Sequence, residues 1–475
     1  MNDNTETKSI DELVARARCA QQRYEATADQ QRYDRACQAV AWALMEPVRN
    51  HALASRAVAD TGLGNVEDKI TKNTNKTLGL MRDIKGVRAT GHVGDDTALG
   101  ISTYMRPKGV VAAIVPSTNP LATPVNNAIN ALKSGNAIIL APSPKGTAVL
   151  AELLGYIHAE LRSINEDPDL VQMVPSPPSK AKTARLMELA DLVVVTGSRN
   201  NVRAGYSSGT PALGVGVGNV VTIIDETADV TAATKKIAAS KVFDNATSCS
   251  SENAIIAVDA VYDAVVDALA AAGGMLLSPD QVSRLEKLHW HNGHMTAAIL
   301  AKDIAVVLEK MDLADTAPEG TRFLVAPTEG AGPANLLSGE KMARFLALYR
   351  ASDFTEAAAL AVSIQNYMGA GHSLGLHSAL DERAHFLAAN ARTCRIIVNQ
   401  AHCFANGGFF NNGMPFSLSM GCGSWGGNSI DENLNWKHFV NNVKIVREIP
   451  ENRPSLEDIF GEYWQQTGSG PRGVA

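Results

Sequence analysis

Short apolar runs alternate with stretches of helical periodicity from residue 109 onward. The runs predict buried strands at residues 110–115, 136–140, 169–174, 192–195 and 220–224, with helices near 124–133, 144–162, 179–190 and 199–208 between them. Strands that alternate with helices predict a parallel sheet covered on both faces, in a Rossmann-like doubly wound α/β arrangement. Ligands of such sheets bind at the carboxyl ends of the strands, so the loops that follow those ends become the predicted binding site.

The segments on either side differ from this pattern. Residues 10–45 are rich in Ala, Gln and Arg and place Leu13, Ala17, Ala20 and Tyr24 on one helical face, and residues 69–85 continue the amphipathic character. Residues 99–105 alternate like an exposed strand. Helices are therefore predicted to form the front of the chain, ahead of that strand.

A second alternation of strands and helices follows residue 249. It predicts strand 254–258, helix 260–272, an irregular middle with the apolar run 323–326, helix 354–366 and strand 394–398. Glycine is concentrated at 406–413 and 421–428, which predicts loops that another backbone or a ligand approaches closely. Residues 436–449 alternate once more, and 467–475 resemble a disordered tail.

Composition narrows the function classes. At 475 residues, with 45% apolar and 19% charged residues, the chain is typical of a soluble protein of two or three domains. A net charge of −6 argues against nucleic acid or anionic membranes as partners. No run of 18 apolar residues and no secretory signal is visible, and six scattered cysteines indicate reduced thiols, so a cytoplasmic protein is expected.

Metal binding is not predicted. No pair of cysteines has the Cys-x-x-Cys spacing of a zinc site. His289, His291 and His294 lie close together, but they lack a carboxylate partner and a regular helical spacing, so a polar surface or loop is the simpler interpretation.

Cys249 is the candidate nucleophile. It lies in the segment Phe243–Asn253 among small polar residues, between a helix-like stretch and an apolar strand. A thiol at the mouth of such an element can be reached by a substrate. The alternative is that Cys249 is a small buried apolar residue, as free cysteines often are.

Five ordered motifs extend the argument over nearly the whole chain. They are Val111–Pro120, Thr196-Gly-Ser198, Pro211–Asn219, Cys249 and Leu418–Ser429. In this order they resemble the CoA-acylating branch of the aldehyde dehydrogenase superfamily. The resemblance implies a cofactor-binding Rossmann-like domain at residues 1–240, an α/β catalytic domain at 241–430, and a C-terminal oligomerisation segment and tail at 431–475. Strand 99–105 would contribute to oligomerisation.

The resemblance also implies a mechanism. The Cys249 thiolate adds to an aldehyde, hydride passes to a nicotinamide cofactor, and coenzyme A takes the acyl group from the resulting thioester. Asn119 would stabilise the developing oxyanion with its side-chain N–H, although Asn is also common in turns before proline. His372 would handle a proton at the active site or on coenzyme A, or it is structural.

One departure from the hydrolytic members concerns the product. Those enzymes carry Glu-Leu-Gly-Gly-Lys, whose glutamate activates water, whereas this chain has Gly214-Val-Gly-Val-Gly218. Without that carboxylate a thioester persists until coenzyme A arrives, which favours an acyl-CoA product. The run also matches Gly-x-Gly-x-Gly, but it precedes a strand, so it lacks the context of a dinucleotide fingerprint.

The cofactor site follows from the same resemblance. Residues 141–144 are Ala-Pro-Ser-Pro where NAD-preferring relatives have Lys-Pro-Ser-Glu, so the carboxylate that repels a 2′-phosphate is missing and NADP is slightly favoured over NAD. The implied cofactor-binding residues are Ser117, Thr118, Pro142, Ser143, Lys145, Thr196, Gly197, Ser198, Gly216 and Glu340.

Substrate and assembly rest on the resemblance alone. It implies a small aldehyde, with sulfoacetaldehyde first and acetaldehyde or succinate semialdehyde as alternatives, in a homodimer or homotetramer. A sulfonate needs a cation or N–H donors, for which Arg106, Arg203, Arg395 and the amides of 406–413 are candidates. A hydrolytic dehydrogenase, an acyl-phosphate reductase and a non-catalytic member of the same fold are the other hypotheses.

Overall fold

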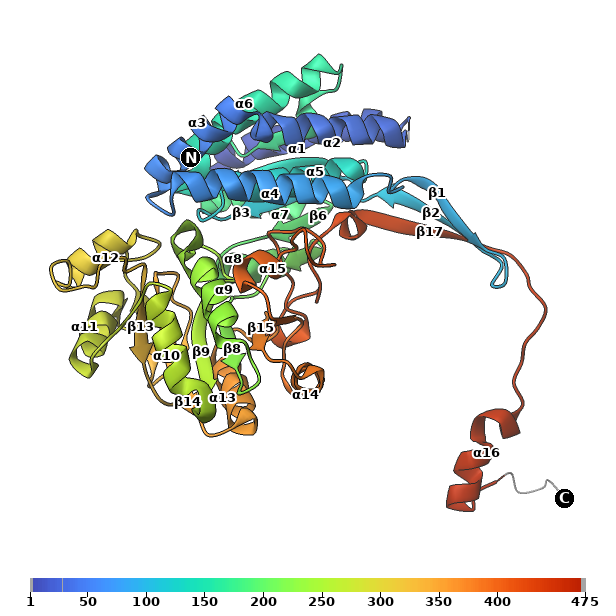
Figure 1. Ribbon diagram of the computed structural model, residues 1–475. Helices are drawn as coiled ribbons and strands as arrows, with labels where there is room; N and C mark the ends of the chain where they lie inside the picture. The colour runs from blue at the N-terminus through green and yellow to red at the C-terminus, as the bar shows by residue number, and fades with distance from the viewer. Residues whose placement is uncertain (1–2, 28, 471–475) are drawn as a thin grey trace.

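Four helices form the N-terminal layer. The computed structural model describes residues 3–27 and 29–470, and the helices are α1 (Asp3–Glu25), α2 (Gln30–Met45), α3 (Pro47–Thr61) and α4 (Val66–Ile84) (Figure 1). α3 ends at Gly62, whose φ of 67° is the left-handed geometry that closes many helices. Asn65 then begins α4 by accepting a hydrogen bond from Asp68 N–H. The helical front predicted from the sequence is confirmed.

The first parallel sheet has five strands in the order β5-β4-β3-β6-β7. Its strands are β3 (Val110–Val115), β4 (Ala137–Pro142), β5 (Val171–Met173), β6 (Leu192–Val195) and β7 (Ala212–Gly214). The helices that connect them are α5 (Ala122–Lys133), α6 (Thr147–Ser163), α7 (Lys180–Leu189) and α8 (Arg199–Tyr206). β3, β4 and β6 are buried throughout, as expected for continuous apolar runs covered on both faces.

The second parallel sheet has seven strands in the order β10-β13-β14-β9-β8-β15-β16. The strands are β8 (Val220–Ile224), β9 (Glu252–Val258), β10 (Gly274–Leu276), β13 (Phe323–Pro327), β14 (Phe345–Ala351), β15 (Leu374–His377) and β16 (Ile396–Val398). The helices are α9 (Val230–Val242), α10 (Tyr262–Ala271), α11 (Pro279–His289), α12 (Ile304–Lys310), α13 (Phe354–Tyr367), α14 (Asp381–Asn390) and α15 (His402–Ala405), and a short hairpin joins β11 (Trp290–His291) to β12 (His294–Met295).

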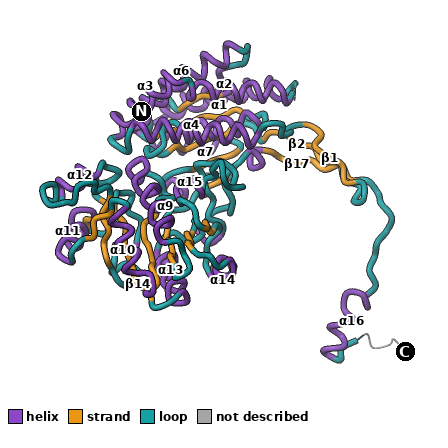
Figure 2. The backbone as a smooth tube through the Cα atoms, viewed as in Figure 1, coloured by secondary structure: helices purple, strands orange, loops and turns teal. Residues whose placement is uncertain are grey.

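The two sheets have separate cores. Apolar residues of α1, α2 and α5 pack with the first sheet in one cluster, which includes the predicted face of Leu13, Ala17, Ala20 and Tyr24. The two faces of the second sheet are covered by two further clusters. Figure 2 shows the corresponding two lobes, with the helical layer and first sheet above and the second sheet below. The α/β fold with two parallel sheets agrees with the prediction.

One strand belongs to a different sheet from the one predicted. Residues 220–224 were grouped with the strands before them, but β8 pairs with β9 and β15 in the second sheet. Hydrophobic pattern identifies a buried strand without specifying its neighbours, so the change of sheet between β7 and β8 is invisible in the sequence. The predicted strand at 169–174 is also shorter, because residues 168–170 form a 3₁₀ turn.

The third sheet is antiparallel and projects from the body (Figure 1). It consists of β1 (Gly91–Asp96), β2 (Ile101–Pro107) and β17 (Val440–Val446), with Val443 opposite Tyr104. The two alternating segments 99–105 and 436–449 are therefore not separate exposed edges: β2 and β17 pair with each other and leave β1 and β17 as the edges. Pairing between strands more than 300 residues apart has no local sequence signal.

Beyond β17 an extended segment leads to α16 (Leu456–Thr467), which the sequence analysis did not predict. The tail expected at 467–475 is described only to residue 470, and residues 471–475 lie outside the described part. Between residues 3 and 470, as far as the structure describes them, no helix has the length and apolar character needed to cross a membrane.

Candidate active site

Cys249 lies at the start of β9, a central strand of the second sheet, after a sharp turn. The turn consists of Asp244, Asn245 and Ala246, which all have left-handed φ angles of 47°, 53° and 60°. Such a conformation costs a non-glycine residue roughly 1–2 kcal/mol, so contacts elsewhere have to hold the turn in place. Those contacts come from α4 in the other lobe.

Asp244 is the anchor of this turn. Its carboxylate is fully buried and forms ion pairs with Lys69 (3.2 Å) and Lys72, and it accepts a hydrogen bond from the Thr247 hydroxyl (2.7 Å). Burial alone would raise the pKa of Asp244, but the ammonium groups of Lys72 and Lys69 outweigh it and hold that pKa below its usual value. The buried ion pairs therefore join α4 to the segment that carries the nucleophile.

Asn119 is brought to the same place. It follows β3 in the loop 116–120, and its Oδ1 accepts a hydrogen bond of 3.0 Å from Lys72, whose ammonium also donates to Thr247 Oγ1 at 3.1 Å. One lysine thus bridges the loop of Asn119 and the segment of Cys249. With Oδ1 occupied and no acceptor for Nδ2 among the described residues, the amide has both of its donors left for a ligand.

The glycine run lies directly against Cys249. A Cβ added to Gly218 would lie 2.1 Å from the carbonyl oxygen of Cys249 and 2.6 Å from its Cβ, and one added to Gly216 would lie 2.5 Å from Cys422 Sγ. Only glycine permits this approach. The run therefore forms one wall beside the nucleophile.

Gly214 begins the run that, by its sequence resemblance, is expected to stand where the hydrolytic branch has its water-activating glutamate. It has no left-handed φ, but the space that a side chain would need is filled by α8. An added Cβ would lie 2.6 Å from Val202 Cγ1 and 2.9 Å from the Tyr206 ring, and the Tyr206 hydroxyl accepts the Gly214 N–H at 3.0 Å. Val202 and Tyr206 thus occupy the space beside Gly214, a packing that has no local sequence signal.

The Cys249 thiol is protonated in the resting site. Burial, followed by the nearby charge of Glu340, raises the pKa of Cys249 to about 12. The thiols of Cys403 and Cys422 are similarly affected by burial, with pKa values of about 12 and 11. Cys249 differs from those two in being partly exposed, whereas both of them are buried.

His372 is fully enclosed beside β15. Its Nδ1 lies 2.8 Å from Ser373 Oγ, which in turn lies 2.8 Å from His402 Nε2, while its Nε2 is buried without a hydrogen-bond partner. Burial and the charge of Arg395 lower the pKa of His372 well below 6.5. The imidazole is therefore neutral at pH 7, with Nε2 unpartnered.

The predicted cofactor residues follow three adjacent strands. Ser117 and Thr118 follow β3. Pro142 is the last residue of β4, and Ser143 and Lys145 follow it. The run 196–198 follows β6. Because these strands are neighbours in a parallel sheet, their loops meet at one edge. Ser143 Oγ is buried there without a partner, and Lys145 is exposed. A hydroxyl and an ammonium group are thus available for a ribose or a phosphate.

Glu340 enters from the second lobe, after the 3₁₀ turn Leu336–Ser338. Burial raises its pKa to about 7, against the opposing charges of Arg199, Lys241 and Lys341. Thr196, on the other side, has its hydroxyl 2.5 Å from Ser419 Oγ. Both lobes therefore contribute residues to the predicted cofactor site. Gly216, in the glycine run, is another of its predicted residues.

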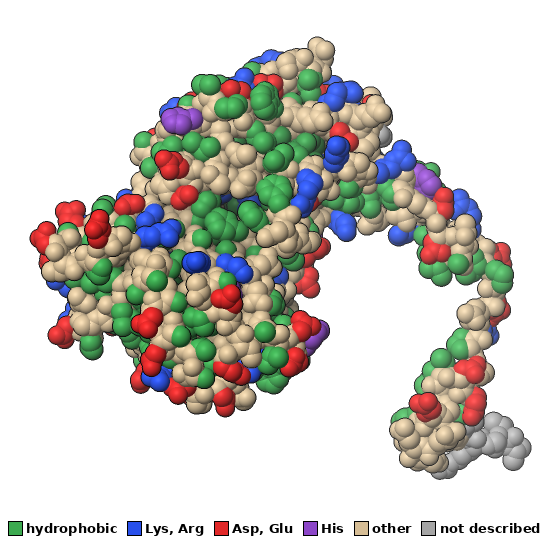
Figure 3. Space-filling model, viewed as in Figure 1, with side chains coloured by type: hydrophobic (Ala, Val, Ile, Leu, Met, Phe, Trp, Pro, Cys, Tyr) green, Lys and Arg blue, Asp and Glu red, His purple; other side chains and the backbone are tan. Residues whose placement is uncertain are grey.

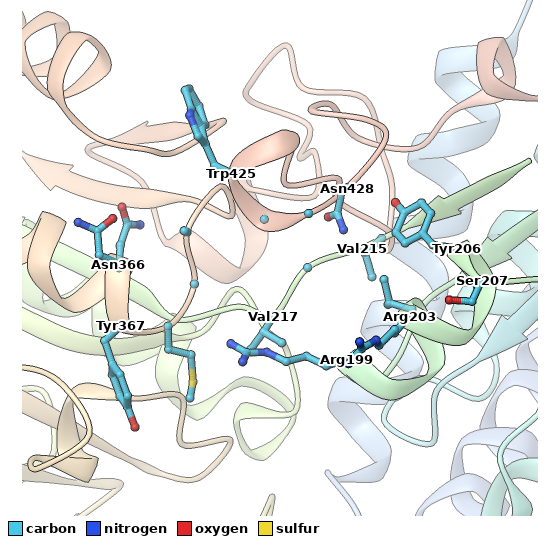
Figure 4. A pocket seen from close by; sticks show the side chains of 18 residues that line it. Arg199, Arg203, Tyr206, Ser207, Val215, Val217, Asn366, Tyr367, Trp425 and Asn428 are labelled. Atoms are coloured by element: carbon cyan, nitrogen blue, oxygen red, sulfur yellow. The ribbon is translucent and has the colours of Figure 1, made fainter.

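A cavity of about 450 Å³ opens between α8, the glycine run and the loops 366–370 and 425–428. Figure 4 shows Arg199 and Arg203 of α8 on its wall, with Arg199 extending towards Val217 and with Tyr206 and Asn428 above. Figure 3 shows further Lys and Arg side chains along the seam between the lobes. Two arginines give this cavity a positive charge suited to phosphate groups.

The arginines proposed as anion ligands are placed differently. Arg106 is exposed on β2 and pairs with Glu25 (2.6 Å), and Arg203 lines the cavity beside α8. Arg395 donates to the carbonyls of His372 (2.8 Å) and Gly421 (2.7 Å), so it fixes backbone segments. Within the described ranges, no three His, Cys, Asp or Glu side chains are arranged to hold a metal ion.

Comparison with known proteins agrees with these features. The family model for the aldehyde dehydrogenase family matches residues 3–438. The chain is 51% identical to an acylating sulfoacetaldehyde dehydrogenase of Cupriavidus necator, over 97% of this chain and 93% of that one, and 39% identical to one of Bilophila wadsworthia, over 92% and 95%. The crystal structure of an acetylating aldehyde dehydrogenase from Geobacillus thermoglucosidasius superimposes with a TM-score of 0.91 at 30% identity, covering 96% of this chain and 100% of that one.

Proposed function

Because the chain belongs to the aldehyde dehydrogenase family, we propose that it oxidises sulfoacetaldehyde to sulfoacetyl-CoA, reversibly, with NAD(P) and coenzyme A. The observation that carries the acylating assignment is Gly214, whose surroundings leave no room for a water-activating carboxylate. The identity of 51% to a relative named for this substrate supports sulfoacetaldehyde over acetaldehyde or succinate semialdehyde.

Cys249 forms the covalent intermediate. Its thiol proton leaves first, since a thiol with a pKa of about 12 is a weak nucleophile, and the proton passes to the Glu340 carboxylate, which has a pKa of about 7 and is the charge that acts most strongly on Cys249. The thiolate then adds to the aldehyde carbon. Asn119 Nδ2 donates to the oxygen that gains negative charge, and Lys72 holds the amide in this orientation through Oδ1.

The residues of the predicted cofactor site would hold a nicotinamide cofactor, which would supply the hydride acceptor needed to convert the adduct on Cys249 into a thioester. Ser117, Thr118, Ser143 and residues 196–198 would hold the cofactor from the first lobe, and Glu340 and Gly216 would contact its nicotinamide end. The free hydroxyl of Ser143 and the exposed ammonium of Lys145 suit a 2′-phosphate, which supports NADP over NAD.

Coenzyme A completes the reaction by attacking the thioester with its thiol. His372 accepts the thiol proton at Nε2, which is neutral and unpartnered. The sulfoacetyl group passes to coenzyme A and Cys249 is regenerated. The positive cavity of Arg199 and Arg203 would take a phosphate-bearing part of coenzyme A or of the cofactor.

The domain roles follow from this chemistry. Residues 1–240 would bind the cofactor, 241–430 would carry catalysis, and 431–475 would serve oligomerisation together with strand β2. The exposed edges β1 and β17 support a homodimer or homotetramer. Six free cysteines support a reducing compartment, the cytoplasm.

A reaction without coenzyme A tests the function. Mixed with aldehyde and NAD(P) alone, the enzyme should reduce about one equivalent of cofactor per active site and then stop, because no group activates water at the thioester. Adding coenzyme A should restore steady turnover. Continuous reduction without coenzyme A, with free acid as product, would instead establish a hydrolytic dehydrogenase, and no reduction under either condition would indicate a non-catalytic protein.

A further inference from the structure

One face of α4 carries three lysines towards the active site. Lys69, Lys72 and Lys76 are spaced by three and four residues, so they lie on the same side of the helix. Asp244 pairs with the first two. Two ammonium groups therefore share one carboxylate, and the third, that of Lys76, adds a positive charge on the same face of the helix.

Lys76 is the member of this face without a carboxylate partner. Its Nζ donates to the carbonyl oxygens of Gly407 (2.8 Å) and Gly408 (2.9 Å) and lies 5.4 Å from the centre of the Phe416 ring. Throughout the described residues, no Asp or Glu oxygen lies within 4.0 Å of it. An ammonium group has three donors, so one N–H of Lys76 remains available.

The surroundings of Lys76 connect directly to the nucleophile. The glycines that it contacts follow Asn406, whose Nδ2 donates to the hydroxyl of Ser250, the neighbour of Cys249, at 2.9 Å. One turn earlier on α4, Lys72 contacts Asn119 and Thr247. Lys76 thus contacts the glycine loop 406–413, which Asn406 joins to the segment of Cys249, and it lies one turn of α4 from Lys72, the lysine that contacts Asn119.

From this placement we propose that Lys76 binds the anionic group of the aldehyde and selects sulfonate substrates over neutral ones. The inference rests on the proposed function and identifies a residue for its substrate preference. A sulfonate one methylene group from the carbonyl has three acceptor oxygens, which suit an ammonium group with a free donor. Lys72 is less suited to this role, since Asp244, Asn119 and Thr247 already take its three donors.

The charge of Lys76 gives the proposal a pH signature. Burial lowers the pKa of Lys76 to about 8, with the neighbouring charges of Cys403 and Lys72 acting in opposite directions. Arg82 also lies over the Phe416 ring, and it pairs with Asp83 (2.8 Å). The ammonium form of Lys76 is present below pH 8 and is lost above it. The KM for sulfoacetaldehyde should therefore rise above pH 8, whereas the KM for acetaldehyde should stay unchanged.

The test compares Lys76→Met with Lys76→Arg and with Lys85→Met, an exposed lysine just beyond the C-terminal end of α4. Lys76→Met should lower kcat/KM for sulfoacetaldehyde about 30- to 100-fold and change kcat/KM for acetaldehyde less than threefold, since only the anionic substrate loses a charged hydrogen bond. Lys76→Arg should retain most of the preference, and Lys85→Met should resemble the wild type.

Several results would overturn the inference. Equal losses for both aldehydes in Lys76→Met would make Lys76 structural, while the acylating function of the wild type would still stand. Binding of ethanesulfonate, measured by calorimetry, provides a readout without turnover, and it should weaken in Lys76→Met. If ethanesulfonate binds this variant as tightly as the wild type, Lys76 does not contact the sulfonate, even where the protein turns over neither aldehyde.

Discussion

The role of Asn119 can be isolated by the substitution Asn119→Asp. The aspartate keeps the shape of the side chain and the oxygen that accepts from Lys72 at 3.0 Å, so the bridge to the Cys249 segment is retained. The change replaces the Nδ2 donor with a carboxylate oxygen and adds one negative charge. Loss of one such donor costs roughly 3 kcal/mol of transition-state stabilisation, which corresponds to about a 100-fold slower reaction.

The first turnover is the appropriate measurement. Without coenzyme A, absorbance of the reduced cofactor after rapid mixing reports formation of the thioester alone, free of product release. Asn119→Asp should slow this burst about 100-fold or more, because the added negative charge also opposes formation of the thiolate. Asn119→Ala, which adds no charge, should give the loss due to the donor alone. Cofactor affinity and Tm should stay near the wild-type values, and burst rates within threefold of wild type in both variants would refute an oxyanion role for Asn119.

Four other substitutions give separate tests. Cys249→Ala should abolish the burst while cofactor binding measured by fluorescence is retained; a remaining burst would identify another thiol as the nucleophile. Pro144→Glu should lower the NADP/NAD preference about tenfold by placing a carboxylate beside the 2′-phosphate, and an unchanged ratio would exclude this loop from phosphate recognition. His372→Ala should leave the burst intact and slow only the step that needs coenzyme A, as single-turnover kinetics would show. Gly218→Ala should lower the free energy of unfolding by about 1–3 kcal/mol through its clash with Cys249, whereas Gly155→Ala, a helix position open to solvent, should stabilise the protein slightly in the same denaturant titration.

Much of the fold was predictable because its strands are continuous apolar runs. β3, β4, β6 and β9 were located within two residues, since burial on both faces of a parallel sheet leaves a strong sequence signal. β15 was missed because Leu374-Gly-Leu-His377 is short and contains a glycine. β14 was also missed, because its apolar run lies within a stretch that otherwise lacks regular periodicity.

The site was predictable where motifs are local and was missed where it depends on packing. Cys249 and Asn119 lie in recognisable segments, and the structure brings those segments together. Lys72 and Lys76 were missed because lysines on an amphipathic helix usually face solvent, and the sequence does not reveal which face another lobe covers. Three lysines at spacings of three and four on one helix were the available signal.

The buried ion pairs of Lys69 and Lys72 with Asp244 have a dynamic consequence. They join a helix of one lobe to the catalytic turn of the other, so a hinge motion of the lobes would have to break both ion pairs and move the left-handed turn away from the helix that holds it. We therefore expect the two lobes to move as one body near Cys249, and the exchange of cofactor and coenzyme A to depend on motions of loops at the mouth of the seam.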